Sequence, residues 1–141
     1  MVDIDNRTKR VSQNSHLVII CDDTGIFKAF EFTKERLVEE ENIWLSFIYA
    51  VSEENSHPLF EQELSILECR FFEYLLVFRQ KIEQGTSCIK QELLEAVINS
   101  NTSKKIEFIV FGTEEFTSQL EDILNFLGIQ SSQLTITTIN K

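Results

Sequence analysis

The sequence predicts an α/β protein with three layers, in which helices cover both faces of a mainly parallel five-stranded sheet. Three observations carry this prediction. Short apolar runs rich in branched residues alternate along the chain with segments of helical spacing. Only one Pro and four Gly occur in 141 residues, which argues against disorder and against a turn-rich β-sandwich. Hydrophobic residues make up 43% of the chain, enough to bury the core of one domain.

The first half of the chain supplies two strands and two helices in alternation. His16 to Cys21 (HLVIIC) has the composition of a strand that is buried on both faces. A helix is predicted over residues 25–40, because apolar side chains recur there among charges at helical spacing. Residues 43–51 (IWLSFIYAV) predict a second buried strand. Pro58 begins a short helix through LFEQELSIL, since Pro is tolerated in a first helical turn.

The second half repeats the alternation and starts with a strand over residues 71–79 (FFEYLLVFR). A helix, a strand, a helix and a last strand are predicted over residues 88–99, 106–111, 114–127 and 134–139. Gly128 directly follows the last helix, where glycine commonly ends a helix. The predicted domain spans residues 16–141. Residues 1–15 have few apolar side chains and no periodicity, so we expect a polar N-terminal arm.

Charge, hydropathy and cysteine usage exclude several classes of protein. The formal charge of −10, with no run of basic residues longer than a pair such as Lys104-Lys105, argues against nucleic-acid binding. No apolar run approaches the roughly 20 residues that cross a bilayer, and the N-terminus lacks a secretory pattern. We therefore expect a cytoplasmic protein without a membrane partner. Three widely spaced cysteines, Cys21, Cys69 and Cys88, support neither a disulfide framework nor a zinc site.

The predicted topology directs the search for a site to one edge of the sheet. Ligands of open α/β sheets bind beyond the carboxyl ends of the strands, where the strand order reverses. A loop between a strand and a helix can hold pyrophosphate there, because free backbone N–H groups and the helix dipole favour an anion. The segments to search are residues 21–26, 50–55, 78–85 and 111–115.

In order and spacing these segments resemble the nucleotide-binding domain of ferredoxin-NADP reductases and related flavin oxidoreductases, over about residues 16–139. The family's Ala-Gly-Gly-Thr-Gly loop after the first strand is represented here by Cys21-Asp22-Asp23-Thr24-Gly25. IYAVSEENSHPLFEQEL stands for the second strand and its Leu-Phe-x-x-Glu-Leu helix. Phe111-Gly112-Thr113 stands for the Cys-Gly-Pro turn, and LGIQSSQLTITTI for the closing strand.

The resemblance implies an oxidoreductase-family domain with NAD(P) as its cofactor. It places Thr24, Gly25, Gly112 and Thr113 in contact with the nucleotide, and Arg79 at the 2′-phosphate of NADP, although Arg79 also fits an ordinary surface arginine. No catalytic residue and no metal ligand are implied. No flavin-binding barrel precedes the first predicted strand, so an active enzyme would work with a flavoprotein or another protein partner.

Four positions depart from the family's pattern. Asp22 and Asp23 replace two glycines of the phosphate loop and bring negative charge to a site for phosphates. Ser52 stands where the family has an Arg that helps to hold the adenosine end, and Phe111 replaces the cysteine near the nicotinamide. The sequence therefore predicts a stand-alone NAD(P)-binding-type domain whose nucleotide binding is weakened or lost.

Other readings stay open at this point. The first alternative is a partner-binding scaffold that keeps the fold without the cofactor. The second is a receiver-type phosphotransfer domain, since Asp22-Asp23 resembles the acidic pair that helps to hold magnesium there, but FEYLLVFRQK lacks the required Asp. A haloacid-dehalogenase-type hydrolase needs two acids separated by one residue. Helix capping by Asp23, with Asp22 beside the helix dipole, also accounts for the acidic pair. His16 and His57 lack an acid or thiol partner at an obvious spacing and are expected to be structural or solvent-facing.

Overall fold

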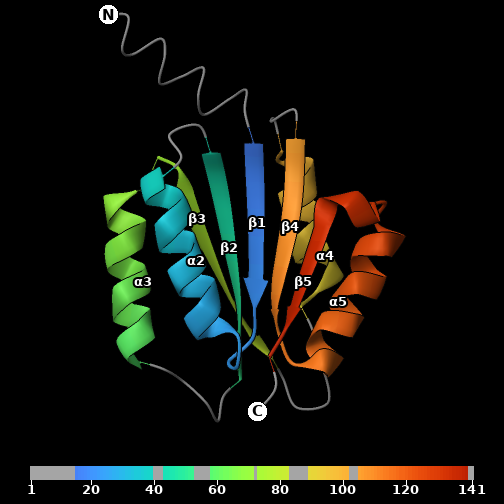
Figure 1. The fold of residues 1–141 in the computed structure, drawn as a ribbon, viewed down its shortest axis with the longest axis horizontal. Coiled ribbons are helices and arrows are strands. Elements are labelled where there is room, and N and C mark those ends of the chain that lie inside the picture. The colour runs from blue at the N-terminus through green and yellow to red at the C-terminus, as the bar shows by residue number, and fades with distance from the viewer. Residues whose placement is uncertain are drawn as a thin grey trace, which may run out of the picture.

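Strands and helices alternate along the chain (Figure 1). The computed structural model describes residues 15–39, 43–52, 58–71, 73–82, 89–101 and 105–139. The strands are β1 (Ser15–Cys21), β2 (Ile43–Ser52), β3 (Leu75–Ile82), β4 (Lys105–Gly112) and β5 (Leu134–Thr138). The helices are α2 (Ile26–Glu39), α3 (Pro58–Arg70), α4 (Gln91–Asn99) and α5 (Glu114–Phe126), and a short 3-10 turn, η2 (Ser131–Gln133), precedes β5.

The five strands form one parallel sheet in the order β3-β2-β1-β4-β5. From β1 the chain moves outward to β3, then crosses to the other side of β1 and continues to β5. The predicted α/β class and parallel five-stranded sheet are therefore confirmed. The order differs from the 2-1-3-4-5 order of flavodoxin-like and receiver domains.

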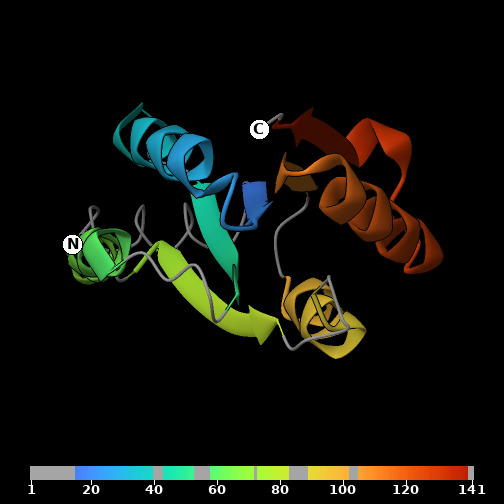
Figure 2. The same cartoon turned by 90° about the horizontal axis from the view of Figure 1, so that it is seen from below.

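Helices α2 and α3 cover one face of the sheet, and α4 and α5 cover the other (Figures 1 and 2). This division follows from the handedness of the crossovers. Right-handed connections that move outward in opposite directions from the centre place their helices on opposite faces. The predicted three layers are therefore present. The direction in which successive strands are added reverses between β1 and β4, and the place where these two strands end is called the switch point below.

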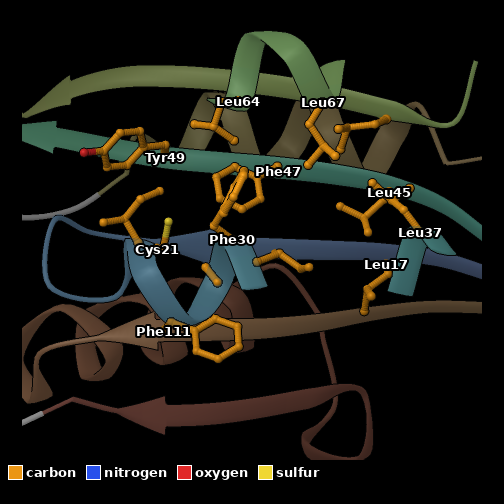
Figure 3. Packing of buried hydrophobic residues seen from close by; sticks show 14 of the residues in the cluster. Leu17, Cys21, Phe30, Leu37, Leu45, Phe47, Tyr49, Leu64, Leu67 and Phe111 are labelled. Atoms are coloured by element: carbon orange, nitrogen blue, oxygen red, sulfur yellow. The ribbon is translucent and has the colours of Figure 1, made fainter. Parts of the chain in front are cut away.

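The central strand β1 contributes side chains to both layers of the core. Leu17, Ile19 and Cys21 point toward α2 and α3, whereas Val18 and Ile20 point toward α4 and α5, and all five are at most 3% exposed. Such strands read as continuous apolar runs because helices cover both faces. Each buried aliphatic side chain contributes roughly 1.5–3 kcal/mol to stability. Figure 3 shows the layer between the sheet and helices α2 and α3. Side chains of β1 and β2 pack there with Phe30, Leu37, Leu64, Leu67 and Phe111.

Gly128 ends α5 as predicted. Its φ of +94° lies in the left-handed region, which favours glycine. The N–H of Gly128 donates to the Asn125 carbonyl at 3.1 Å, and the N–H of Ile129 donates to the Leu124 carbonyl at 2.9 Å. These two bonds form a Schellman motif, and Ile129 and Leu124 are both buried in the layer beneath α4 and α5.

The prediction of a third strand over residues 71–79 was wrong in its position. Helix α3 continues to Arg70, a turn follows, and β3 begins only at Leu75. The Phe71 carbonyl accepts hydrogen bonds from the N–H groups of Tyr74 and Leu75, both at 2.9 Å, which closes the turn. Phe71 and Tyr74 are half-buried against the core. The apolar run is therefore shared between a helix end and a strand, which composition alone does not separate.

The remaining boundaries differ slightly from those expected. Strand β1 begins at Ser15, one residue before the predicted start, and α4 begins at Gln91 rather than at residue 88. Residues 1–14, most of the predicted arm, lie outside the described residues, as do His57, Cys88 and Lys104. Within the described ranges no helix is long and apolar enough to cross a membrane.

A polar cluster is buried at the amino ends of β1 and β2. His16 is 3% exposed; its Nε2 lies 2.8 Å from the Ser46 hydroxyl and its Nδ1 lies 3.1 Å from Asn101 Oδ1. A neutral imidazole satisfies both contacts when Nδ1–H donates to Asn101 and Nε2 accepts from Ser46. Burial lowers the pKa of His16, although the Asn101 hydrogen bond opposes this shift. The histidine is structural, as expected.

This cluster predicts a loss of stability in mild acid. Because the pKa of His16 is lower in the folded state than its ordinary value of 6.5, the unfolded chain binds the proton more readily. The free energy of unfolding should be highest above about pH 6.5 and should fall as the pH is lowered through that value. Urea unfolding between about pH 7.5 and 5.0 measures this, with the His16→Gln variant as a control that keeps His57. Equal pH dependence in both proteins would contradict the prediction.

Candidate site at the switch point between β1 and β4

The turns after β1 and β4 lie at the same rim of the sheet, where the strand order reverses. Cys21 pairs with Phe111, so the two strands end side by side. Helix α2 leaves this point toward one face and α5 toward the other. The first turns of two helices therefore meet at one place. Each presents the positive end of its helix dipole and backbone N–H groups that have no partner within the helix.

The two turns touch each other through their backbones. The Asp22 N–H donates to the Phe111 carbonyl at 3.3 Å. A Cβ atom on Gly25 would lie 2.3 Å from that carbonyl oxygen, and one on Gly112 would lie 2.6 Å from the Phe116 ring and 2.9 Å from Asp22 Oδ2. Both glycines are thus required by close approach of neighbouring atoms.

The Asp22 carboxylate lies between the two turns and accepts hydrogen bonds from both. Its Oδ1 accepts from the N–H groups of Thr24 (3.0 Å) and Gly25 (2.9 Å) and from the Thr24 hydroxyl (2.7 Å). Its Oδ2 accepts from the N–H of Thr113 (3.1 Å) and from the Thr113 hydroxyl (3.4 Å). Three backbone amides and two hydroxyls therefore converge on one carboxylate of the chain itself.

Thr113 also caps α5. Its hydroxyl oxygen accepts from the Phe116 N–H at 3.3 Å, while its backbone adopts the extended conformation usual for an N-cap. Acidic residues Glu114 and Glu115 occupy the first turn of α5. The donors around Asp22 are consequently held in place by the helix they begin.

Asp23 has a different partner. Its Oδ1 accepts a hydrogen bond from the Tyr49 hydroxyl at 3.0 Å. Burial, followed by the hydrogen bond to Asp23 and the charge of Asp23, raises the pKa of the Tyr49 phenol above its ordinary value. Tyr49 therefore stays protonated and donates. Tyr49 was not predicted as a site residue. It could have been found from its hydroxyl group, because it lies near the end of the second strand, and that strand pairs with the one that precedes Asp22 and Asp23.

Of the residues predicted to contact a nucleotide, the structure brings Thr24, Gly25, Gly112 and Thr113 together. It places Arg79 elsewhere. Arg79 lies on β3, two strands from β1, where its Nε contacts Glu61 Oε1 at 2.5 Å and its Nη2 lies 3.6 Å from Glu68 Oε1. Both glutamates belong to α3. The Ser52 side chain lies outside the described part of the molecule.

The sequence matches no protein-family model and no curated protein. Solved structures are nevertheless similar to the chain. The CS-b5R domains of human Ncb5or in the NAD+ form give a TM-score of 0.72 at 16% identity, over 92% of this chain and 38% of that one. A flavohemoglobin from Malassezia yamatoensis with bound FAD and heme gives 0.68 at 17% identity, over 90% and 32%. A mutant ferredoxin-NADP+ reductase of Plasmodium falciparum in complex with 2′P-AMP gives 0.62 at 14% identity, over 96% and 54%.

The fold is that of a ferredoxin-reductase-type nucleotide-binding domain. At these identities the likeness establishes the fold alone. The chain spans about a third to a half of the length of these proteins.

The Phe111 side chain is 6% exposed and packs in the layer beneath α2 and α3. A shallow, open hollow of about 310 Å³ lies along the flank of α2. Among the described residues no group of three or more His, Cys, Asp or Glu could hold a metal ion.

Close packing at the switch point predicts unequal effects of two glycine substitutions. Gly25→Ala should destabilise the domain by about 3 kcal/mol, because its Cβ meets the backbone of Phe111. Gly128→Ala should cost only about 1 kcal/mol, since Gly128 has a positive φ but no atom within 4 Å of the added Cβ. Urea denaturation followed by circular dichroism measures both values. Equal losses would contradict the predicted contact between the turns.

The environment of Cys21 predicts an unreactive thiol. Burial, and then the charges of Asp22 and Asp23, raise the pKa of Cys21 well above its ordinary value, whereas Cys69 is exposed. Because the thiolate is the reactive form, iodoacetamide should modify Cys69 in the native protein and reach Cys21 only on unfolding. Peptide mass spectrometry measures this, with Cys69→Ser as the control. Rapid native labelling at Cys21 would show the prediction to be wrong.

Proposed function

We propose that this chain is an oxidoreductase-family NAD(P)-binding-type domain whose nucleotide binding is weakened or lost, because its own Asp22 carboxylate occupies the anion position. The hydrogen bonds of that carboxylate carry the proposal. They come from Thr24, Gly25 and Thr113, the groups from which a pyrophosphate at this switch point would need its donors.

A phosphate could reach these donors only if Asp22 left them. Each hydrogen bond to a charged group contributes about 1.5–3 kcal/mol, so giving up several of them opposes nucleotide entry. If the carboxylate stayed nearby, it would repel a phosphate at about 4 Å by about 4 kcal/mol at an effective dielectric near 20. That repulsion alone corresponds to nearly three orders of magnitude in affinity.

The distant end of a bound nucleotide would receive little help in this chain. Arg79, the predicted partner of a 2′-phosphate, already contacts Glu61 and Glu68 of α3. These ion pairs are partly exposed and are individually weak, but their two carboxylates also reduce the positive potential that a phosphate would meet. The arginine of the family pattern is replaced by Ser52. Both features support weakened binding of NADP as well as NAD.

The second candidate is a partner-binding scaffold in the cytoplasm, acting with a flavoprotein or another protein. Large apolar side chains on the surface favour it: Phe27 and Phe126 are 68% and 76% exposed. Exposed aromatic side chains are typical of interaction surfaces when they are grouped with other apolar residues. This role is compatible with the first, since a domain that has lost its cofactor can keep its protein contacts.

Titration with NADPH and NADH, followed by ligand fluorescence and calorimetry, tests the proposal. The wild-type chain should bind neither nucleotide more tightly than about 1 mM. Asp22→Gly, which frees the donors and restores the family's glycine, should strengthen binding at least about tenfold, equivalent to 1.4 kcal/mol. Asp22→Asn, which removes the charge and keeps the shape, should give a smaller gain.

Asp23→Asn is the matched control. It removes one charge from the same turn without freeing the donors held by Asp22, so its gain should be smaller than that of Asp22→Gly. Far-UV circular dichroism verifies that each variant is folded. Micromolar binding by the wild-type chain would overturn the proposed loss of function. A folded Asp22→Gly variant with unchanged affinity would show that the Asp22 carboxylate is not the cause.

A further inference from the structure

The face of the sheet that carries α2 and α3 is left uncovered at β5. In Figure 2, α2 lies over the centre of the sheet, and no helix of the described part covers β5 on that side. Thr135 and Thr137 pair in register with Ile109 and Phe111 and therefore point to this same face. Thr135 is exposed and Thr137 is half-buried.

The hollow of about 310 Å³ lies along the flank of α2, and its lining includes Phe111 of β4, the strand that pairs with β5. Its apolar lining consists of three aromatic rings, those of Phe27, Phe32 and Phe111. Phe32 and Phe111 have ring centroids 5.9 Å apart in a tilted arrangement, so the floor is packed. Phe27 is 68% exposed. Glu31, Glu35 and Lys28 complete the lining.

We propose that this hollow, which is separate from the anion position at Asp22, is a docking site for a basic, apolar segment of a protein partner. One apolar side chain of that segment lies against the three phenylalanine rings. A neighbouring Lys or Arg of the segment meets Glu31 and Glu35.

Charge favours a basic partner over an acidic one. The whole chain carries a formal charge of −10, which attracts cationic segments and repels anionic ones. The lining of the hollow holds two carboxylates and the ammonium of Lys28, and Lys34 and Arg36 lie beside it on α2. Glu31 also lies 3.5 Å from Lys34, but both side chains are exposed, and such surface pairs exchange readily with other cations.

The aromatic rings of α2 already receive cations from within the chain. The Lys34 ammonium lies 5.2 Å from the Phe30 ring centroid, and the Arg36 guanidinium lies 5.5 Å from that of Phe32. Both distances are within the range of cation–π attraction. Cations of the chain therefore already lie at the rings and carboxylates of this flank, and a Lys or Arg of the partner would take the place that Lys34 holds at Glu31.

The openness of the hollow favours a protein segment over a small molecule. Ligand pockets of about 300–1,000 Å³ bury most of their ligand's surface. This hollow has such a volume but is shallow and open, and Phe27 stands largely in solvent. A polypeptide can instead cover Phe27 and extend over the Thr135 and Thr137 face, which places more of its surface in contact.

Selection from a displayed library of random peptides of about twelve residues, with the full chain as target, tests this inference. Enriched peptides should contain an apolar residue flanked by Lys or Arg. Phe27→Ala should weaken binding of a synthetic copy at least about fivefold by fluorescence anisotropy, the effect of losing one aromatic contact of about 1 kcal/mol. The double change Glu31→Gln and Glu35→Gln should also weaken it and reduce its salt dependence.

Phe126→Ala is the matched control, because Phe126 is a similarly exposed phenylalanine on α5, on the opposite face. It should leave peptide affinity unchanged. Enrichment of acidic peptides, or peptide binding that survives Phe27→Ala, would overturn the inference. So would sedimentation showing a dimer of the wild-type chain that Phe27→Ala dissociates, since the occupant would then be a second copy.

Discussion

The amino ends of helices α2 and α5 lie at one point of this molecule, and the backbone N–H groups there need hydrogen-bond acceptors. The first turns of α2 and α5 meet where β1 and β4 end side by side. Backbone N–H groups in a first helical turn have no partner within the helix, so an anion there removes several unsatisfied donors at once. The Asp22 carboxylate supplies that anion from within the chain and ties Thr24 and Gly25 to Thr113. The packing around the switch point follows from this one arrangement.

Much of the fold follows from sequence because the strands are buried on both faces. HLVIIC and the runs over residues 43–51 and 106–111 are apolar at nearly every position, as expected of strands that helices cover on both faces. The third strand was misplaced because Phe71 and Tyr74 belong to the same apolar run yet close the end of α3. Local composition records that a residue is buried, but whether a helix end or a strand buries it depends on tertiary contacts.

The candidate site, too, could be predicted from the sequence only in part. Order and spacing along the chain brought Thr24, Gly25, Gly112 and Thr113 to one rim, because parallel strands end at the same edge of a sheet. The separate partners of the two neighbouring acids could not be read from sequence. Asp22 reaches Thr113, which is 91 residues away, and Asp23 meets Tyr49 across the adjacent strand. Arg79 likewise has its place determined by glutamates of α3, which lie near it only once β3 and α3 have packed.

Phe111 connects the switch point to the flank of α2. Its backbone carbonyl accepts from the Asp22 N–H and lies against Gly25, while its ring packs on Phe32 at the floor of the hollow. A backbone fixed on one side by the Asp22 turn gives the ring a defined position on the other. The hydrogen bonds of Asp22 and the ring packing of Phe111 are therefore coupled through one stretch of the β4 backbone.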